Sequence, residues 1–307
     1  MGYIRLKNGQ VALRPKTNLK WQEMQIISYD IELSWAGVVY GDDKFVALGA
    51  GYKSGVYSTD GITWTETHWA GKELGGRCLT YGGNKFVTAG GYSTDGITWT
   101  ETTMPELGGE TAFYERITYG GNKFVAVGQS YNGAYSTDGI TWTKMNMPRH
   151  QDWDELAYGN GVFVALGNQL SPASGEYIAC STDGITWTEV TSPFSGLLHH
   201  MIFANGQFVI LTNLEVGFSS DGETWNIYQH NLSFNPWIIA YGNNKFVVLG
   251  GQTDNSWAYS TDGITWTEAT TIDAKSWNAI AYGNGRFVAV ASFDNNGAYL
   301  NASDFNK

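Results

Sequence analysis

The sequence predicts an all-β protein: a seven-bladed β-propeller of four-stranded antiparallel blades, with the last blade closed by a strand from the N-terminus. Three observations predict it. A ten-residue phrase, YSTDGITWTE at Tyr57, returns in identical or closely similar form at Tyr92, Tyr135, Cys180, Phe218 and Tyr259. A second phrase, of the type YGNNKFVVLG, alternates with the first. The tandem repeat has a period near 40 residues and no helical periodicity, which is typical of propeller blades.

The second phrase predicts the two inner strands of each blade. An apolar run such as 280–282 precedes a Gly/Asn turn and another such as 287–290 follows it, which is the pattern of a β-hairpin. One phenylalanine marks each copy, and successive copies are 38 to 45 residues apart: Phe45, Phe86, Phe124, Phe163, Phe208, Phe246 and Phe287. Seven copies predict seven blades.

The first phrase predicts the two outer strands. Its Asp-Gly pair, at 60–61 in the first copy, supplies the positive φ angles of a tight hairpin turn. A two-residue turn would place Tyr57 opposite Trp64 on the neighbouring strand, and we expect this aromatic pair to pack against the next sheet.

The outer phrase occurs six times, and its missing seventh copy predicts how the ring closes. After Tyr299 the chain stops where the fourth strand of the last blade is due, but residues 17–23 align with that strand. Trp21 precedes Phe45 by 24 residues, close to the spacing of the other copies. We therefore expect Trp21 to belong to the outer strand of the last blade, which protects an open sheet edge.

This alignment predicts a single propeller over residues 17–307. Two interpretations of residues 1–16 stay open: an extra hairpin that turns at 8–10, or an N-terminal extension that attaches the propeller to a larger assembly.

Composition narrows the function classes. A net charge of −11 argues against binding to nucleic acid, which needs clustered Lys and Arg. No signal peptide is visible and no stretch approaches a membrane span, so we expect synthesis in the cytoplasm and no membrane insertion. Cys78 and Cys180 occupy different repeat positions, which predicts buried free thiols.

The phrase Ser-Thr-Asp-Gly-Ile-Thr-Trp resembles the Asp-box, or BNR repeat, of sialidase-like propellers, in a form one residue shorter than usual. The near-identical repeats also resemble those of phage tail and microbial surface-adhesion proteins. The resemblance implies a virion- or tail-associated or cell-surface location. In the Asp-box family the aspartate belongs to a structural turn at the blade periphery. By that resemblance the following are structural rather than catalytic: Asp60, Asp95, Asp138, Asp183, Asp221 and Asp262.

The uniform turns of both phrases are expected on one face of the ring, because strand directions alternate. The variable loops then share the other face, and functional residues concentrate on loops held by a rigid scaffold. Counting back four or five residues from the first aromatic of each inner phrase predicts a ring around the channel mouth. Its members are Trp35, Arg77, Tyr114, Trp153, His199, Trp237 and Trp277, with Trp257 farther out.

Aromatic rings among polar side chains suit sugar binding, since the apolar faces of sugars stack on indoles. We therefore predict a non-catalytic, lectin-like recognition module that binds a glycan or a cell-surface receptor, without metal or cofactor. The same aromatics would equally serve to plug the channel or to pack between blades.

Two further functions stay open. One is a polysaccharide-active glycosidase that uses loop carboxylates, for which the candidates are Glu115, Asp152, Asp154, Glu155 and Asp273. The other is a structural propeller that docks another protein. Sialidase chemistry is disfavoured, because it needs an arginine cluster and the arginine motif that precedes a sialidase's first Asp-box is not visible. Joint metal binding by His199 and His200 is also disfavoured, since neighbours on a strand point to opposite faces.

Overall fold

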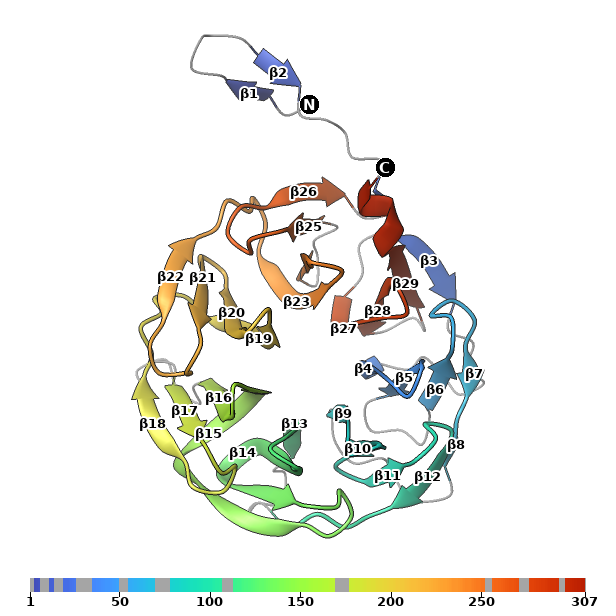
Figure 1. Ribbon diagram of the computed structural model, residues 1–307, viewed down its shortest axis with the longest axis vertical. Helices are drawn as coiled ribbons and strands as arrows, with labels where there is room; N and C mark the ends of the chain where they lie inside the picture. The colour runs from blue at the N-terminus through green and yellow to red at the C-terminus, as the bar shows by residue number, and fades with distance from the viewer. Residues whose placement is uncertain are drawn as a thin grey trace.

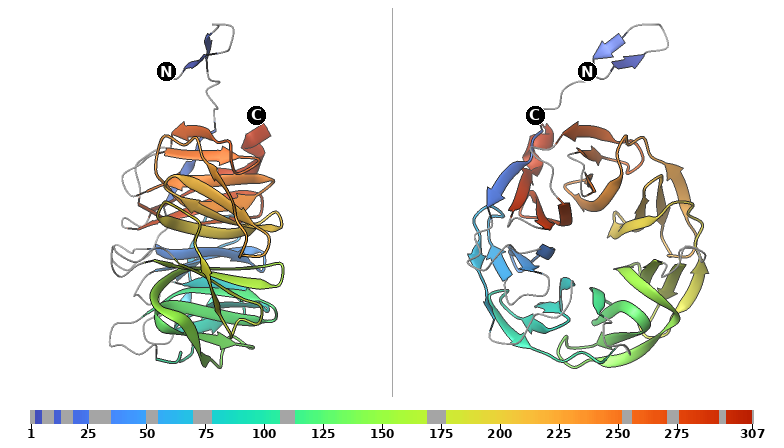
Figure 2. Two further views of the ribbon diagram at one scale, coloured as in Figure 1. Left: turned by 90° about the vertical axis from the view of Figure 1, so that its left-hand side faces the viewer. Right: turned by 180° about the vertical axis from the view of Figure 1, so that it is seen from behind.

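The computed structural model describes residues 3–5, 11–13, 19–25, 35–49, 55–69, 78–106, 113–168, 177–251, 256–270, 276–292 and 296–306. These residues form 29 β-strands and one 3-10 helix, η1 (Ala302–Asn306). The sheets are arranged as a ring around a central opening (Figure 1), and they stand side by side around its circumference when the ring is turned on edge (Figure 2). The predicted all-β propeller class is confirmed.

Four blades are separate four-stranded sheets, numbered here in ring order. Blade 1 contains β4 (Trp35–Gly41), β5 (Lys44–Gly49), β6 (Gly55–Ser58) and β7 (Thr65–Glu66). Blade 5 contains β19 (Leu198–Ala204), β20 (Gln207–Thr212), β21 (Glu215–Ser219) and β22 (Asn226–Gln229). Blade 6 contains β23 (Pro236–Gly242), β24 (Lys245–Gly250), β25 (Ser256–Ser260) and β26 (Thr267–Thr270). Blade 7 contains β27 (Ser276–Gly283), β28 (Arg286–Ser292), β29 (Asn296–Asn301) and β3 (Gln22–Gln25).

The remaining blades depart from this pattern. Blade 2 contains β9 (Leu79–Gly82), β10 (Lys85–Thr88), β11 (Gly91–Ser93) and β12 (Thr98–Glu101), and the parallel strand β8 (His68–Trp69) lies beside β12. Blades 3 and 4 share one six-stranded sheet of β13 (Tyr114–Gly120), β14 (Lys123–Ser136), β15 (Thr143–Gly159), β16 (Val162–Asn168), β17 (Tyr177–Ser181) and β18 (Thr188–Thr191). The long strand β15 is the outer strand of blade 3 and continues as the inner strand of blade 4, which links the two blades.

The seven inner hairpins traced in the described residues turn as the sequence predicts, which is compatible with seven blades. Both central residues of each turn have positive φ, as a type I′ turn requires. Asn and Gly, which tolerate this conformation, fill all of these turns except the first, where two aspartates stand. The pairs are Asp42–Asp43, Gly83–Asn84, Gly121–Asn122, Asn160–Gly161, Asn205–Gly206, Asn243–Asn244 and Asn284–Gly285.

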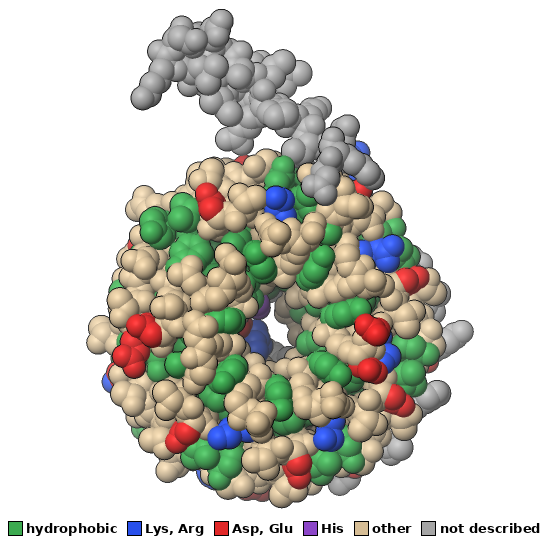
Figure 3. Space-filling view, viewed as in Figure 1, with side chains coloured by type: hydrophobic (Ala, Val, Ile, Leu, Met, Phe, Trp, Pro, Cys, Tyr) green, Lys and Arg blue, Asp and Glu red, His purple; other side chains and the backbone are tan. Residues whose placement is uncertain are grey.

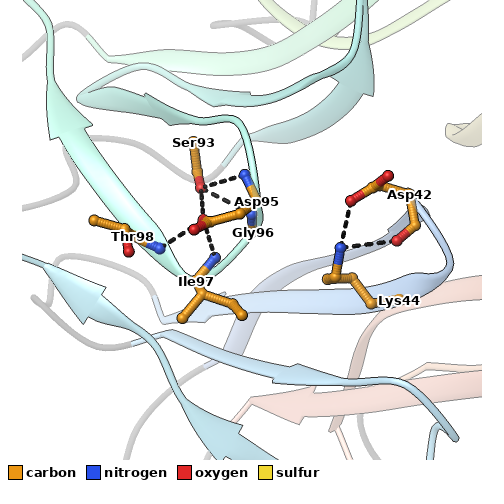
Figure 4. Close-up of polar contacts among 7 residues, drawn as sticks. All are labelled: Asp42, Lys44, Ser93, Asp95, Gly96, Ile97 and Thr98. Atoms are coloured by element: carbon orange, nitrogen blue, oxygen red, sulfur yellow. Dashed lines mark hydrogen bonds and ion pairs between the residues drawn. The ribbon is translucent and has the colours of Figure 1, made fainter.

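The outer hairpins are one residue longer than predicted. Tyr57 pairs with Thr65, not with Trp64, and the other copies have the same register. The extra residue lets one carboxylate cap two successive backbone N–H groups. At Asp95, Oδ1 accepts hydrogen bonds from the N–H groups of Ile97 and Thr98, each at 2.8 Å, and from the Ser93 hydroxyl at 2.9 Å (Figure 4).

Each of the six repeat aspartates lies in such a turn, on the outer hairpin of its blade. Burial alone would raise the pKa of Asp183, but hydrogen bonds from Thr186, Ile185 and Ser181 outweigh burial and lower the pKa to about 2. The pKa of each of the other five is lowered for the same reason. These carboxylates therefore stabilise the turns as ionised groups.

Neighbouring blades pack through a glycine at the end of six of the seven inner strands. A Cβ added at Gly120 would lie 2.0 Å from Cγ of Tyr158 in the next blade, so the ring of Tyr158 occupies the space that a side chain would need. The same contact joins blade 7 to blade 1, where Tyr40 covers Gly283. Blade 5 has Ala204 at this position. Hydrophobic clusters fill the space between successive blades.

The predicted closing strand is present. β3 pairs antiparallel with β29, and Gln22 faces Tyr299 just as Thr65 faces Tyr57 in blade 1, so Trp21 matches Trp64. Trp21 is buried, and its ring lies 6.1 Å from Trp257 and 6.4 Å from Trp277. The N-terminal strand therefore completes both the sheet and the core of blade 7.

Two other expectations concern the N-terminus and the thiols. β1 (Tyr3–Arg5) pairs antiparallel with β2 (Val11–Leu13), and the turn expected at 8–10 lies outside the described residues. The domain boundary at residue 16 stays a prediction. Cys78 and Cys180 are buried free thiols, as predicted, and burial raises the pKa of each to about 12.

Candidate functional site at the channel mouth

The uniform turns lie together on one face of the ring, which we call the turn face. The Asn160 side chain, on an inner turn, donates hydrogen bonds to the carbonyl oxygens of Gly206 and Ser220 on the next blade, at 2.9 and 3.0 Å. Asn284 of blade 7 reaches the Thr59 carbonyl of blade 1 in the same way, at 3.1 Å. Inner and outer turns are thus joined blade to blade. The opposite face, where the inner strands begin, is called the variable face.

Six inner strands carry a β-bulge at the same repeat position, close to where each strand begins on the variable face. In β19, for example, Leu198 pairs with Thr212 and His200 pairs with Leu211, which leaves His199 as the extra residue. A bulge re-aims the side chain of the extra residue and is common beside functional sites. We call the six extra residues the bulge ring: Ala36, Glu115, Asp154, His199, Trp237 and Asn278.

Each residue of the bulge ring is of a different type, although the position is the same. Glu115 is buried and accepts a hydrogen bond from Gln129 Nε2 at 3.3 Å, and Asn278 donates one to the carbonyl oxygen of Trp35 at 2.6 Å. The bulge recurs at the same position of the repeat, whereas the residue type at that position differs from blade to blade. The ring therefore gives each sector of the channel mouth its own chemistry.

The residue that directly follows the bulge is polar in three successive blades, and these three side chains lie close together. Arg116 Nη2 lies 2.7 Å from Glu155 Oε1, and His200 Nε2 lies 4.0 Å from Glu155 Oε2. The Glu155 side chain is only 7% exposed, whereas that of Arg116 is 34% exposed. Figure 3 shows the central opening with basic and histidine side chains inside it. The strands that carry this cluster border the central opening (Figure 1), and the side chain of Arg116 is partly exposed to solvent.

The cluster shifts the pKa values of its bases in opposite directions. Burial lowers the pKa of Arg116, but the carboxylates of Glu155, Glu115 and Asp154 together outweigh burial, and the net pKa is raised. Burial lowers the pKa of His200; Glu155 opposes this only in part, and Arg116 adds to it. Burial also lowers the pKa of His199. Both imidazoles are therefore neutral at pH 7, and Arg116 is the cation of the cluster.

Trp237 presents an aromatic surface beside this cluster. Its side chain is 39% exposed, and its ring centroid lies 5.1 Å from that of His199 on the neighbouring blade. His199 Nε2 is buried and has no hydrogen-bond partner among the described residues. Blades 5 and 6 thus offer an exposed indole face that packs beside a buried imidazole.

Exposed apolar side chains concentrate on the variable face. Leu197, at 64% exposed, directly precedes β19, and Leu214, at 52%, lies in the adjoining connection between β20 and β21. The two are neighbours, because the Leu197 N–H donates to Asn213 Oδ1. In blade 3, Phe113 directly precedes β13 and Tyr131 lies at a bulge within β14, and each is more than half exposed. These four residues and Trp237 form what we call the variable-face patch.

The structure corrects most of the predicted aromatic ring. Five of its members are buried in the cores between blades and offer no stacking surface to a ligand: Trp35, Tyr114, Trp153, Trp257 and Trp277. Tyr114 and Trp153 also donate hydrogen bonds to the backbone carbonyls of Pro105 and Arg149. For the four that begin inner strands the physical reason is the bulge, because the residue before it packs into the inter-blade core while the extra residue is re-aimed. Trp257 lies on β25, where it packs against Trp21.

The other predicted members are His199 and Trp237, which belong to the bulge ring, and Arg77, which lies outside the described residues. The prediction missed Arg116 and His200 as site residues. Glu155 was considered only as a glycosidase carboxylate. All three occupy one repeat position, three residues before the first aromatic of the inner phrase. Counting back three residues, instead of four or five, would have found them.

Two further observations bear on the chemistry of the site. The described part of the chain holds no group of three or more His, Cys, Asp or Glu side chains that could bind a metal ion. The same residues include no helix with the length and hydropathy of a membrane span.

No family model and no curated protein matches this chain. Solved structures do match. Virginiamycin B lyase from Staphylococcus aureus has a TM-score of 0.76 at 15% sequence identity, over 92% of this chain and 99% of that chain. YCF48 bound to D1 peptide has a TM-score of 0.69 at 16% identity, over 93% and 97% of the two chains. The WD40 β-propeller domain of Doa1 has a TM-score of 0.65 at 12% identity, over 91% and 96%.

The fold is a β-propeller. At these low identities the likeness extends to the fold alone, because one propeller scaffold serves many unrelated functions. The activity or ligand of each neighbour therefore stays with that neighbour. The Asp-box resemblance likewise remains a likeness of one motif, since no family model accompanies it.

Proposed function

We propose that this protein is a non-catalytic recognition module that binds a cell-surface receptor, protein in nature, through its variable face. The bulge ring is the observation that carries the proposal. One repeated position holds an acidic, an aromatic, an amide or an aliphatic side chain according to the blade, on a scaffold that is otherwise uniform. Such variation beside the central opening is what a surface shaped for one partner requires.

The character of the exposed side chains favours a protein partner. Leu197 and Leu214 offer aliphatic surface, which packs against other proteins and gives little to a sugar. Trp237 lies nearby and has the properties of an interface anchor, because Trp is enriched among residues that contribute most to binding. YCF48, a fold neighbour, was solved bound to a peptide, which is consistent with recognition of polypeptide by such a scaffold.

Glycan binding is the second candidate, and the pair formed by Trp237 and His199 favours it. A sugar ring would stack on the exposed indole of Trp237, which packs beside the imidazole ring of His199. The burial of five predicted aromatics leaves this lectin-like proposal with one exposed indole from the predicted ring.

Neither alternative function draws support from a particular contact. A glycosidase needs one carboxylate free as an acid and another as a base or nucleophile, whereas Glu155 is held by Arg116 and Glu115 by Gln129. A structural propeller would dock another protein through the same face. This alternative predicts a stable partner that purifies with the protein, whereas the recognition function predicts a receptor on a cell.

The proposed location, on a virion or tail or at a cell surface, rests on the repeat resemblance and defines the experiment. Fluorescently labelled protein is added to a panel of bacterial cells, untreated or pretreated with protease or periodate. We expect saturable binding that protease abolishes and that Trp237→Ala weakens by roughly 30-fold, as for an interface anchor. Ile140→Ala, which alters an exposed apolar residue on the turn face, is the matched control and should bind normally.

Each alternative gives a different result. Loss of binding after periodate, but not after protease, would replace the protein receptor with a glycan. Equal binding by the Trp237→Ala and Ile140→Ala variants would contradict recognition through the variable face. No binding to any cell type, together with a stable co-purifying protein, would support the assembly role.

A further inference from the structure

The outer strand of blade 5 differs from the outer strands of the other six blades in its charge. The second residue after the outer-strand tryptophan is charged in those six blades: Glu23, Glu66, Glu101, Lys144, Glu189 and Glu268. Blade 5 has Ile227 at this position. Charged side chains on edge strands oppose pairing with another sheet, so blade 5 lacks a protection that the other six blades share.

The same strand, β22, is an open edge in every other respect. It lies on the outer circumference of the ring (Figure 1), at the end of its sheet, and its sequence Asn-Ile-Tyr-Gln contains neither a charge nor a proline. Among the described strands it pairs with β21 alone, and Tyr228 is 43% exposed. The backbone N–H and C=O groups on its outer side can therefore pair with a further strand.

Blade 2 shows that an outer edge of this propeller accepts an additional strand. β8, from the connection between blades 1 and 2, lies parallel to β12, with His68 beside Thr98 and Trp69 beside Trp99. The connection that leads into blade 5, residues 192–197, is described throughout and adds no strand to β22. A strand that covers β22 would therefore come from another molecule.

The missing charge favours a second copy of this chain as that molecule. When a strand pairs antiparallel with itself about a two-fold axis, the central residue stands opposite its own counterpart. A pair centred on Ile227 or Tyr228 opposes two apolar or two aromatic side chains. In the other blades the first register would oppose two like charges, which destabilises a sheet. A foreign strand could complement a charged edge, whereas a second copy of the same edge cannot.

We propose that this protein forms a two-fold dimer in which β22 of one copy pairs antiparallel with β22 of the other, so that the two blade 5 sheets become continuous. The contact is one strand pair with the side chains of Ile227 and Tyr228, which places it in the small, weak class of interfaces. β22 runs from the turn face to the variable face, so antiparallel pairing directs the two variable faces in opposite directions. The inference is independent of the proposed function.

Small-angle X-ray scattering of the intact protein tests the association. From about 10 µM to about 1 mM, where a weak dimer dissociates, we expect the molar mass to rise from monomer toward dimer. Ile227→Glu installs the residue of most other outer strands and should raise the dissociation constant at least about tenfold. Ile140→Glu adds the same charge on the turn face, at the repeat position where blade 5 carries Glu223, and should dimerise like the parent.

Charge reversal tests whether the pairing is with the same edge. Ile227→Lys, which copies the charge type of blade 3, should also dissociate the dimer, because like charges of either sign repel across the axis. An equimolar mixture of Ile227→Glu and Ile227→Lys should dimerise again, since opposite charges then meet. Amide hydrogen exchange should show protection of residues 226–229 that increases with protein concentration in the parent and in Ile140→Glu. Circular dichroism melting curves check that each variant is folded.

Several results would overturn the proposal. One is a parent protein that stays monomeric at every concentration, and another is equal dimerisation by Ile227→Glu and Ile140→Glu. A dimer without concentration-dependent protection of β22 would place the contact elsewhere. Failure of the mixed Glu and Lys variants to dimerise would contradict pairing of this edge with itself.

Discussion

The indole N–H of Trp64 donates a hydrogen bond to the sulfur of Met24, with 3.1 Å between Nε1 and Sδ. Trp64 belongs to the outer turn of blade 1, and Met24 lies on β3, the strand that closes blade 7. Both side chains are buried in the same hydrophobic cluster, together with residues of β28. The closing strand therefore contributes to two inter-blade cores, through Trp21 on one side and Met24 on the other.

The first prediction concerns this strand. Trp21→Ala removes a buried side chain that packs on Trp257 and Trp277, and we expect a loss of about 3–5 kcal/mol in the free energy of unfolding. Urea denaturation followed by tryptophan fluorescence and circular dichroism measures the change. Deletion of residues 1–13 is the control, because it leaves β3 intact and should change the melting temperature much less. Equal effects of the two changes would contradict the closing role.

The second prediction concerns the glycines at the ends of the inner strands. In Gly120→Ala the added methyl group would meet the ring of Tyr158, and we expect destabilisation by about 1–3 kcal/mol from overpacking. Ala204→Gly makes the reverse change in the blade that already has a methyl group there, and it should cost about 0.5–1 kcal/mol. If Gly120→Ala costs no more than Ala204→Gly, the close approach is not a constraint.

The third prediction compares two Arg–Glu pairs that both join blades 3 and 4. In a double-mutant cycle with Arg116→Gln and Glu155→Gln, we expect a coupling of about 1–3 kcal/mol, because Glu155 is buried. The pair of Arg149 and Glu189 is more exposed, and its coupling should be about 0.2–1 kcal/mol. Unfolding in urea at pH 7 measures both cycles. Similar couplings would show that the burial of Glu155 adds nothing.

The fourth prediction concerns acid stability. The folded protein holds the pKa of Asp183 at about 2, below its usual 3.8, so the stability that this group contributes is present above pH 3.8 and is lost as pH falls toward 2. Asp183→Asn keeps an acceptor oxygen but cannot be ionised. The variant should therefore lose less stability than the parent between pH 4 and pH 2, in urea titrations at each pH. Parallel losses would contradict the assignment.

The fifth prediction concerns the histidines. Folding lowers the pKa of His200 below its usual 6.5, so the unfolded chain binds the proton more readily and stability falls as pH drops below 6.5. His199 and His230 act in the same direction. Thermal melts at pH 7.5 and 5.5 should show a lower melting temperature at pH 5.5. His200→Gln should reduce that difference, and a larger difference in the variant would refute the sign.

The repeat pattern predicted the inner half of each blade in detail. Asn and Gly stand at the positive-φ positions of every inner turn except the first, which has Asp42 and Asp43, and the closing strand was found because Trp21 keeps the spacing of the other repeats. Both features depend on short-range backbone preferences or on repeat spacing, which a single sequence displays directly. The outer turn was one residue too short in the prediction, because side-chain capping by aspartate competes with the two-residue turn that Asp-Gly alone indicates.

The candidate site was harder to predict than the fold. Trp153 and Asp154 are neighbours, yet the first is buried in the core and the second is the bulged residue. A bulge interrupts the alternation on which the assignment of strand faces depends, and no residue in the repeat signals it by type. The pairing of Arg116 with Glu155, 39 residues apart, also depends on the contact between blades rather than on local pattern.

The position of β3 has a consequence for biosynthesis. Gln22 is made long before Tyr299, its partner 277 positions later, so β3 leaves the ribosome with no sheet to join. At about 5–20 residues per second, that wait lasts on the order of tens of seconds. Throughout that time the nascent chain carries an unpaired strand edge and an uncovered Trp21, both of which a chaperone would recognise. Completion of the ring therefore waits for the synthesis of β29.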